Sequence, residues 1–207
     1  MLVVAGGWFI NLVNFMDGLD WITVAEMVPI TAFLTGLGAL GILPMPAALV
    51  AASLCGALLG FAPFNKPVAK LFLGDVGSLP IGLLVGWLLL ELAGAGGIAA
   101  ALLLPLYYLV DATVTLLRRL ARGERVWEAH RTHFYQQATD RGFSALAVSA
   151  HVFGLNLALS ALAAVTLAAP DPAVQIAALL GGFALVGVVL RRFSRPRRAV
   201  LLTGASQ

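Results

Sequence analysis

The most polar stretch within the apolar part of the chain lies at 64–79 and reads FNKPVAKLFLGDVGSL. It sets Asp75 between two glycines, with Lys66 and Lys70 just upstream. Glycine has no Cβ, so its backbone can approach a bulky ligand closely. A hard oxygen ligand on such a glycine turn, with two lysines nearby, suits Mg²⁺ together with phosphate. The alternative is a short loop at the membrane surface with anchoring lysines.

A second set of candidate ligands lies near the N-terminus in the segment NLVNFMDGLD, residues 11–20. Asn11, Asn14 and Asp17 are spaced three apart and therefore fall along one face of a helix. Asp20 follows after a glycine that loosens the helix end. Two amides and two carboxylates at one membrane boundary can bind a metal ion and recognise a polar ligand. The alternative is a polar helix end that meets water, but polar residues within membrane segments favour a functional role.

A third set follows the fifth apolar segment, where His130, Arg131 and His133 stand within four residues. Two imidazoles around a guanidinium offer several hydrogen-bond donors to phosphate. A zinc site is less favoured, because the sequence has no further cluster of Cys or His. The arginines just upstream are expected to hold anionic lipid headgroups: Arg118, Arg119 and Arg122.

Asp111 is an acid inside the fifth apolar segment, and Arg118 lies seven residues further on along the same helix face. Asp111 either neutralises a cation in the site or pairs structurally, and the residues alone leave both roles open. His151, inside the sixth apolar segment, is interpreted as a packed or hydrogen-bonded histidine rather than a ligand.

The elements that must position these residues are membrane-spanning helices. The chain has 207 residues, 60% of them hydrophobic and 11% charged, with a mean hydropathy of +0.95. Soluble domains carry about 25% charged residues. The composition therefore predicts an all-α, polytopic membrane protein in which residues 1–207 form one domain. About seven spans are predicted, at 1–15, 25–43, 45–62, 78–95, 97–117, 143–168 and 172–190. Gly82 and Gly86 indicate a helix-packing seam.

The basic residues predict the orientation of these spans. All 13 Lys and Arg fall in the loops 63–77 and 118–142 and in the tail from Arg191 onward. Counting spans places the three segments on one face, which the positive-inside rule makes cytoplasmic. The net charge of +3 indicates loops that face membrane lipids, not a nucleic-acid-binding domain. The single cysteine, Cys55, excludes an internal disulfide.

Three motifs in order, NLVNFMDGLD, FNKPVAKLFLGDVGSL and AHRTHFYQ, resemble those of the polyprenyl-phosphate N-acetylhexosamine-1-phosphate transferases. This is the superfamily of phospho-MurNAc-pentapeptide translocase, glycosyltransferase family 4. The resemblance implies attack by undecaprenyl phosphate on the β-phosphorus of a UDP-N-acetylhexosamine, with Mg²⁺ or alternatively Mn²⁺, and release of UMP. The third motif is closer to the branch that starts O-antigen and lipopolysaccharide synthesis. A bacterial inner membrane location with a cytoplasmic active site is implied, and a homodimer is one option for assembly.

The resemblance also implies roles for individual residues. Asn14 and Asp75 would bind Mg²⁺, and Asp17 and Asp75 would be the catalytic residues. The remaining candidates would contact the substrate: Asn11, Asp20, Lys70, Phe72, His130, Arg131 and His133.

The chain departs from the family pattern in two respects. Family members have an Asp-Asp pair on an early cytoplasmic loop and more spans, whereas no Asp-Asp pair occurs here. The resemblance therefore implies an N-terminally truncated form, expected to bind UDP-sugar weakly with little transfer. Tyr135 and Gln136 also stand where histidines are common. The alternatives are an inactive homologue that retains UDP-sugar binding and a small membrane transporter that uses the same charged helix ends.

Overall fold

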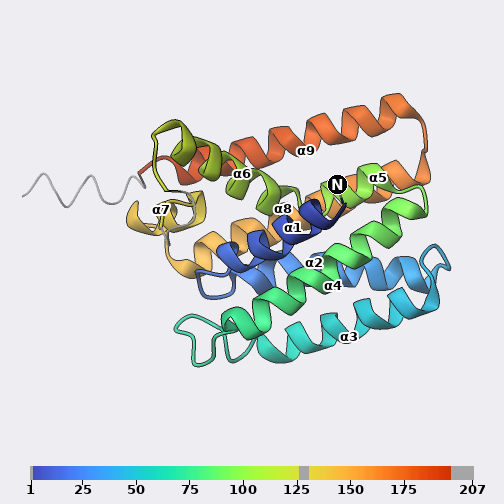
Figure 1. Ribbon diagram of the computed structural model, residues 1–207, viewed down its shortest axis with the longest axis horizontal. Coiled ribbons are helices and arrows are strands. Elements are labelled where there is room, and N and C mark those ends of the chain that lie inside the picture. Colours follow the sequence, from blue (N-terminus) through green and yellow to red (C-terminus); the bar gives the residue numbers. More distant parts are fainter. Residues whose placement is uncertain (1, 126–130, 197–207) are drawn as a thin grey trace, which may run out of the picture.

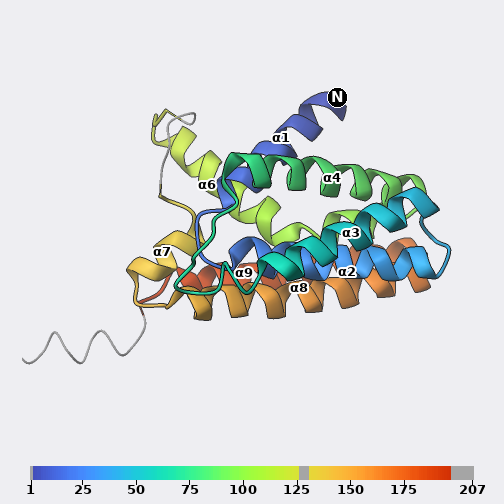
Figure 2. The ribbon, with the colours of Figure 1, turned by 90° about the horizontal axis from the view of Figure 1, so that it is seen from below.

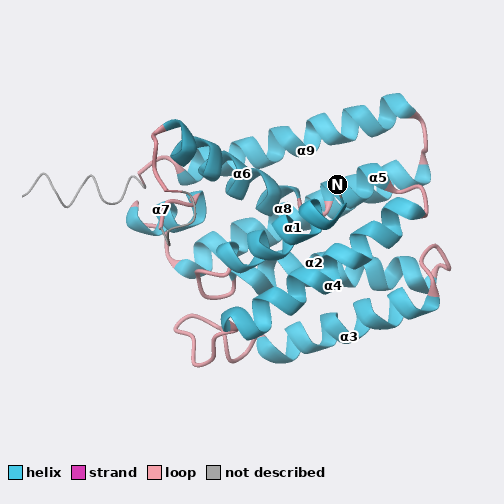
Figure 3. Cartoon of the chain, viewed as in Figure 1, coloured by secondary structure: helices cyan, strands magenta, loops and turns pink. Residues whose placement is uncertain are grey.

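The computed structural model describes residues 2–125 and 131–196, and all regular structure in these ranges is helical (Figures 1 and 3). The helices are α1 (Leu2–Met16), α2 (Ile22–Ala39), α3 (Met45–Phe61), α4 (Gly74–Gly94), α5 (Ile98–Leu103), α6 (Leu106–Ala121), α7 (Phe134–Asp140), α8 (Ala145–Ala168) and α9 (Pro172–Phe193). No strand occurs in the described part of the chain, so the predicted all-α class is confirmed.

Four of these helices, α2, α4, α8 and α9, are long and apolar enough to cross a membrane. They have 18 to 24 residues, and at 1.5 Å per residue the shortest reaches about 27 Å, close to the thickness of the hydrocarbon core. α1 and α3 are also apolar but have only 15 and 17 residues. The long helices run side by side in Figure 1. The chain is therefore a polytopic helical membrane protein.

The predicted fifth span is not a single helix. α5 ends at Leu103 and α6 begins at Leu106, with Pro105 at the break. Proline has no backbone N–H, and its ring clashes with the preceding helical turn, so a continuous helix is disfavoured here. The apolar pattern of the sequence does not reveal this break, because leucines lie on both sides of Pro105. Leu103, Leu104 and Leu106 are all buried. α6 then carries the chain to the end of the bundle where α7 lies (Figures 1 and 2).

Two glycines of α4 allow it to pack closely against α1. A Cβ on Gly82 of α4 would lie 3.0 Å from the Cα of Ile10 in α1, and one on Gly86 would lie 3.1 Å from the ring of Phe9. The predicted packing seam is therefore confirmed, with α1 as the partner. Figure 2 shows α1 crossing behind α4, with the N-terminal part of α1 extending beyond the bundle.

A buried polar contact joins helices that lie far apart in the sequence. Glu26 in α2 and Asn156 in α8 are both inaccessible to solvent, at 0% and 1% exposure. The Asn156 Nδ2 donates to the Glu26 Oε2, and the backbone N–H of Tyr108 in α6 donates to the Glu26 Oε1 at 3.3 Å. Three helices are therefore tied together by one carboxyl group inside the bundle.

The loops of the bundle fall into two groups, one at each end. The α1–α2 turn, the α3–α4 loop, the connection from α6 to α8 and the end of α9 all lie at the left in Figure 1. The α2–α3, α4–α5 and α8–α9 turns lie at the opposite end. The prediction that the basic segments share one face is therefore confirmed for the described residues.

Candidate functional site

A pocket of about 330 Å³ opens at the end of the bundle that carries the basic loops. The α1–α2 turn, the α3–α4 loop and the first turn of α4 form it, so the first two sequence motifs converge there. Its lining includes three carboxylates, and none of the described residues that line it is a Lys, Arg or His. The lining residues are Asn14, Asp17, Gly18, Leu19, Asp20, Asn65, Phe72, Leu73, Gly74, Asp75 and Ser78.

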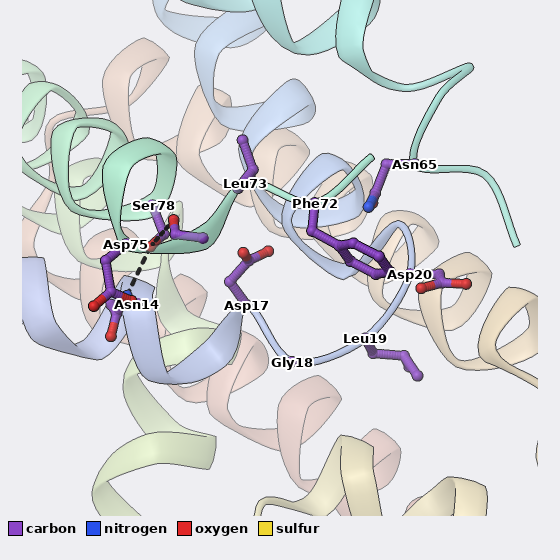
Figure 4. A pocket seen from close by; sticks show the side chains of 11 residues that line it. Asn14, Asp17, Gly18, Leu19, Asp20, Asn65, Phe72, Leu73, Asp75 and Ser78 are labelled. Carbon is purple, nitrogen blue, oxygen red and sulfur yellow. Dashed lines mark hydrogen bonds between the residues drawn. The ribbon is translucent and has the colours of Figure 1, made fainter. Parts of the chain in front are cut away.

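One side of the pocket is formed by Asn14, Asp75 and Ser78 (Figure 4). The Asn14 Nδ2 donates to the Asp75 Oδ1 and to the Ser78 Oγ, both at 2.8 Å. The Ser78 hydroxyl in turn donates to the carbonyl of Gly74 at 2.9 Å. Sequence reasoning missed Ser78, although its spacing of four residues from Gly74 places both on one helix face.

Asp75 does not lie on a glycine turn, as the sequence suggested, but in the first turn of α4. Gly74 begins that helix with a φ of +57°, a left-handed conformation that glycine adopts without a steric penalty. The backbone N–H groups at a helix N-terminus favour a nearby negative charge. The start of α4 therefore stabilises the Asp75 carboxylate in the pocket wall.

Asp17 lies in the middle of the pocket, directly after α1 ends (Figure 4). The Thr23 hydroxyl in α2 donates to the Asp17 Oδ1. Burial raises the pKa of Asp17 to about 6, although the hydrogen bond from Thr23 opposes the shift. Asp17 can therefore gain or lose a proton near neutral pH, unlike an ordinary exposed aspartate.

The opposite side of the pocket is formed by Asp20 and Asn65 (Figure 4). The Asp20 Oδ2 accepts the backbone N–H of Ala69 at 3.0 Å, and the Asp20 carbonyl accepts the Ser149 hydroxyl at 2.8 Å. Asp20 thus connects the α1–α2 turn to the α3–α4 loop and to α8.

Asn65 fixes the backbone around the pocket. It is buried, its Oδ1 accepts the backbone N–H of Trp21 at 2.8 Å, and its Nδ2 donates to the carbonyl of Leu71 at 2.9 Å. Trp21 has a φ of 66°, which is uncommon for a residue with a side chain. Its indole Nε1 donates to the carbonyl of Ala62 at 2.6 Å. These bonds hold the turn in a conformation that it would otherwise disfavour.

Replacing Asn65 with alanine is expected to lower the free energy of unfolding by about 2 kcal/mol, because a buried donor and a buried acceptor would lose their partner. Asn11→Ala is the matched control. It also removes an amide that donates to a backbone carbonyl, but Asn11 is exposed, so its loss should be smaller. Thermal unfolding in detergent measures both variants. An Asn65→Ala protein that unfolds at the wild-type temperature would contradict this role.

The third motif lies at the same end of the bundle but does not line the pocket. Arg131 is exposed, whereas His133 is 3% exposed and its Nδ1 lies 3.2 Å from the Asp111 Oδ1. His130 lies outside the described residues. Of the other predicted substrate contacts, Phe72 lines the pocket and is 70% exposed. Asn11 and Lys70 are exposed outside its lining, and Asn11 donates to the carbonyl of Gly7 at 2.7 Å.

Asp111 organises this third motif. Its contacts support a structural role rather than neutralisation of a cation in the site. It is fully buried and accepts the backbone N–H of Phe134 at 3.1 Å and of Tyr135 at 3.4 Å. The Thr115 and Tyr107 hydroxyls also donate to it, each at 3.2 Å. A carboxylate with these donors holds the first turn of α7 against α6.

The arginines before the motif differ from one another. Arg119 is 6% exposed, pairs with Glu124 at 2.9 Å and donates to the carbonyl of Arg125 at 2.8 Å. The expectation that it holds a lipid headgroup is therefore wrong, since its guanidinium is engaged within the protein. The Arg118 guanidinium lies 4.6 Å from the ring centre of Phe134, which favours cation–π attraction.

The pocket has the donor types that Mg²⁺ prefers, namely carboxylate and amide oxygens. Asn14 and Asp75 already touch each other, with Asp17 in the same pocket. Among the described residues, no three Asp, Glu, His or Cys side chains come close enough to hold an ion by themselves. Mg²⁺ usually keeps several waters and shares substrate phosphates, so a site with few protein ligands fits it.

Fold and pocket together define a polytopic helical membrane protein with an acidic binding pocket at one end of its bundle. The sequence model of glycosyl transferase family 4 matches residues 1–93, which contain every residue that lines the pocket. The match contains the first two of the three motifs and supports the resemblance to this family.

Two relatives illustrate the similarity. The chain is 29% identical over 202 residues to a decaprenyl-phosphate N-acetylglucosaminephosphotransferase from Mycobacterium tuberculosis (strain CDC 1551 / Oshkosh). That match covers 86% of this chain and 50% of the relative. It is 37% identical over 97 residues to a phospho-N-acetylmuramoyl-pentapeptide-transferase from Mycobacterium avium (strain 104), covering 39% of this chain and 27% of the relative. The chain therefore spans about half or less of the length of these relatives.

Proposed function

We propose that this protein transfers a sugar-1-phosphate from a UDP-N-acetylhexosamine to a polyprenyl phosphate, with release of UMP. The observation that carries the proposal is the convergence of Asn14, Asp17, Asp20 and Asp75 around one pocket at the basic end of the bundle. Relatives named for transfer of N-acetylglucosamine phosphate and of phospho-N-acetylmuramoyl-pentapeptide support the reaction class. The product would start a cell-envelope polysaccharide of the O-antigen type, in a bacterial inner membrane with the pocket facing the cytoplasm.

The electrostatics of the pocket require a cation if a diphosphate is to bind there. Three carboxylates line it, and a nucleotide diphosphate would add further negative charge to the same space. Bound Mg²⁺ would neutralise the diphosphate and the charge that develops on the leaving group. Asn14 and Asp75 are the residues that would hold the ion. The hydrogen bond from the Asn14 Nδ2 to the Asp75 Oδ1 supports this pair, because it keeps the two side chains next to each other in the pocket.

Asp17 is the best placed acid–base group. Its pKa of about 6 lies near the operating pH, which is the condition for efficient proton transfer. In the proposed reaction, Asp17 takes the remaining proton from the attacking phosphate of the lipid. The attacking oxygen then forms a bond to the β-phosphorus while the bond to the UMP oxygen breaks.

The remaining residues would bind the substrate. The exposed ring of Phe72 at the pocket lining can stack on uracil. Asp20, on the side of the pocket opposite Asn14 and Asp75, can accept a hydrogen bond from the base. Outside the lining, the expected contacts to the diphosphate or sugar are Asn11, Lys70, His130, Arg131 and His133. Of these, Arg131 and Lys70 are exposed at the basic end and can add positive charge near an entering anion.

The test uses the purified protein in nanodiscs with polyprenyl phosphate and UDP-N-acetylglucosamine. UMP release that requires both Mg²⁺ and the lipid phosphate is the expected result, together with formation of a lipid-linked diphospho-sugar. Mg²⁺-dependent binding of UDP-N-acetylglucosamine without UMP release would favour the inactive homologue. Neither binding nor release, in protein that remains folded, would refute the proposed function.

A further inference from the structure

α7 contacts the pocket at Gly18, in the turn between Asp17 and Asp20. A Cβ added to Gly18 would clash with the Tyr135 hydroxyl and would lie 2.9 Å from the Gln136 Nε2. Gly18 does not have a positive φ, so its backbone conformation alone would accept a side chain. Glycine is therefore required here because the first turn of α7 lies directly against the turn.

Tyr135 also contacts the backbone on both sides of Asp17. It is fully buried, and its hydroxyl donates to the carbonyl of Phe15 at 3.3 Å. The same hydroxyl lies directly against Gly18. One phenol group thus spans the residues that flank Asp17 at the end of α1.

The first turn of α7 is itself held firmly in place. Asp111 accepts the N–H groups of Phe134 and Tyr135, and the backbone N–H of His133 donates to the Gln136 Oε1 at 3.3 Å. Gln136 is only 8% exposed. A path of direct contacts therefore leads from Asp111 in α6, through the first turn of α7, to the backbone next to Asp17.

We propose that Tyr135 and Gln136 are positioning residues of the pocket, which hold Gly18 so that Asp17 and Asp20 keep their places in its lining. Through these contacts, the third motif shapes the pocket without lining it. The effect on catalysis rests on the proposed function, whereas the contact with the turn does not.

A double-mutant cycle between Gly18→Ala and Tyr135→Phe tests the contact. The readout is hydrogen exchange of the backbone between Phe15 and Trp21, measured by mass spectrometry on the purified protein in nanodiscs. Each single variant is expected to speed exchange. Gly18→Ala places a methyl group against the Tyr135 hydroxyl, and Tyr135→Phe removes the hydroxyl that donates to the Phe15 carbonyl. In the double variant the nearest tyrosine atom to the new methyl is the Cζ, at 3.5 Å, an ordinary contact.

The double variant should therefore exchange at least about threefold more slowly than the product of the single effects, which is the scale of coupling between residues in contact. Thr31→Val is the matched control, because it also removes a buried hydroxyl that donates to a backbone carbonyl, but it lies in α2 and does not touch Gly18 or Asp111. Gly18→Ala and Thr31→Val should combine additively. Additive effects for Tyr135→Phe as well would overturn the proposal.

A second measurement separates positioning from general loss of structure. Tyr135→Phe is expected to weaken Mg²⁺-dependent binding of UDP-N-acetylglucosamine about 10-fold, the scale of one lost hydrogen bond to a charged group, because Asp20 is a proposed contact of the base. Exchange within α8 and α9 should stay unchanged. Unaltered UDP-N-acetylglucosamine affinity in a variant with faster exchange at Gly18 would overturn the positioning role. If the double-mutant cycle shows coupling but the wild-type protein binds no UDP-N-acetylglucosamine, only the proposed function is refuted.

Discussion

Asp17→Asn is expected to reduce UMP release about 10²- to 10⁴-fold, the range typical for removal of a group that transfers a proton in the rate-limiting step. The asparagine keeps the size of the side chain and an oxygen that can accept the bond from Thr23. It cannot take a proton from the attacking phosphate. Because the pocket geometry is retained, the change should fall on kcat, with little effect on binding of UDP-N-acetylglucosamine.

Asp140→Asn is the matched control for this change. Asp140 is an exposed carboxylate on α7 at the same end of the bundle and is not part of the pocket lining. The same loss of one negative charge should leave UMP release close to wild type. Comparable losses in both variants would indicate a general effect of charge. An Asp17→Asn protein with wild-type turnover would remove Asp17 from the proposed chemistry.

Asp75→Asn is expected to weaken Mg²⁺-dependent binding of UDP-N-acetylglucosamine about 10- to 100-fold, as is typical for disturbance of a metal site. An amide oxygen can still accept the hydrogen bond from Asn14, so the wall of the pocket should keep its shape. What is lost is the charge of one of the two proposed ligands. Raising the Mg²⁺ concentration should therefore recover part of the affinity.

Titration of UDP-N-acetylglucosamine at several Mg²⁺ concentrations, with calorimetry as the readout, measures this effect. Asp140→Asn again serves as the control for loss of charge at the same end of the protein. If Asp75→Asn bound the nucleotide sugar as well as wild type at every Mg²⁺ concentration, Asp75 would only stabilise the N-terminus of α4 and would not be a metal ligand. That outcome would move the metal site elsewhere in the pocket.

Those parts of the fold that depend on composition and local pattern could be predicted from the sequence. Long apolar runs identified the helical segments, and clustered basic residues placed the connecting loops at one end. Pro105 was overlooked, because leucines continue the apolar pattern across it and only the helix geometry shows the break. Likewise, the burial of Arg119 depends on Glu124, which folds back against it across a turn.

The candidate site was predictable to the extent that its residues are close in sequence. Local spacing identified Asn14, Asp17 and Asp20, and the glycine-flanked Asp75 completed the set. Asn65 and Ser78 were missed, because each acts through backbone or amide contacts with a distant segment. The inward turn of His133 toward Asp111 joins residues that are 22 apart, and no periodic pattern encodes such a contact.

The bond between Glu26 and Asn156 has a consequence for how the chain is made. The two residues are 130 positions apart, so α2 leaves the ribosome long before α8. Glu26 is the fifth of the 18 residues of α2, so its cost in an inserting helix is below the roughly 3 kcal/mol of a charge at the helix centre. During synthesis it has neither Asn156 nor the Tyr108 N–H as a partner. Insertion of α2 is therefore expected to be less efficient when it is synthesised alone than within the whole chain. The helix would settle at its final depth only once translation has delivered the C-terminal part of the bundle.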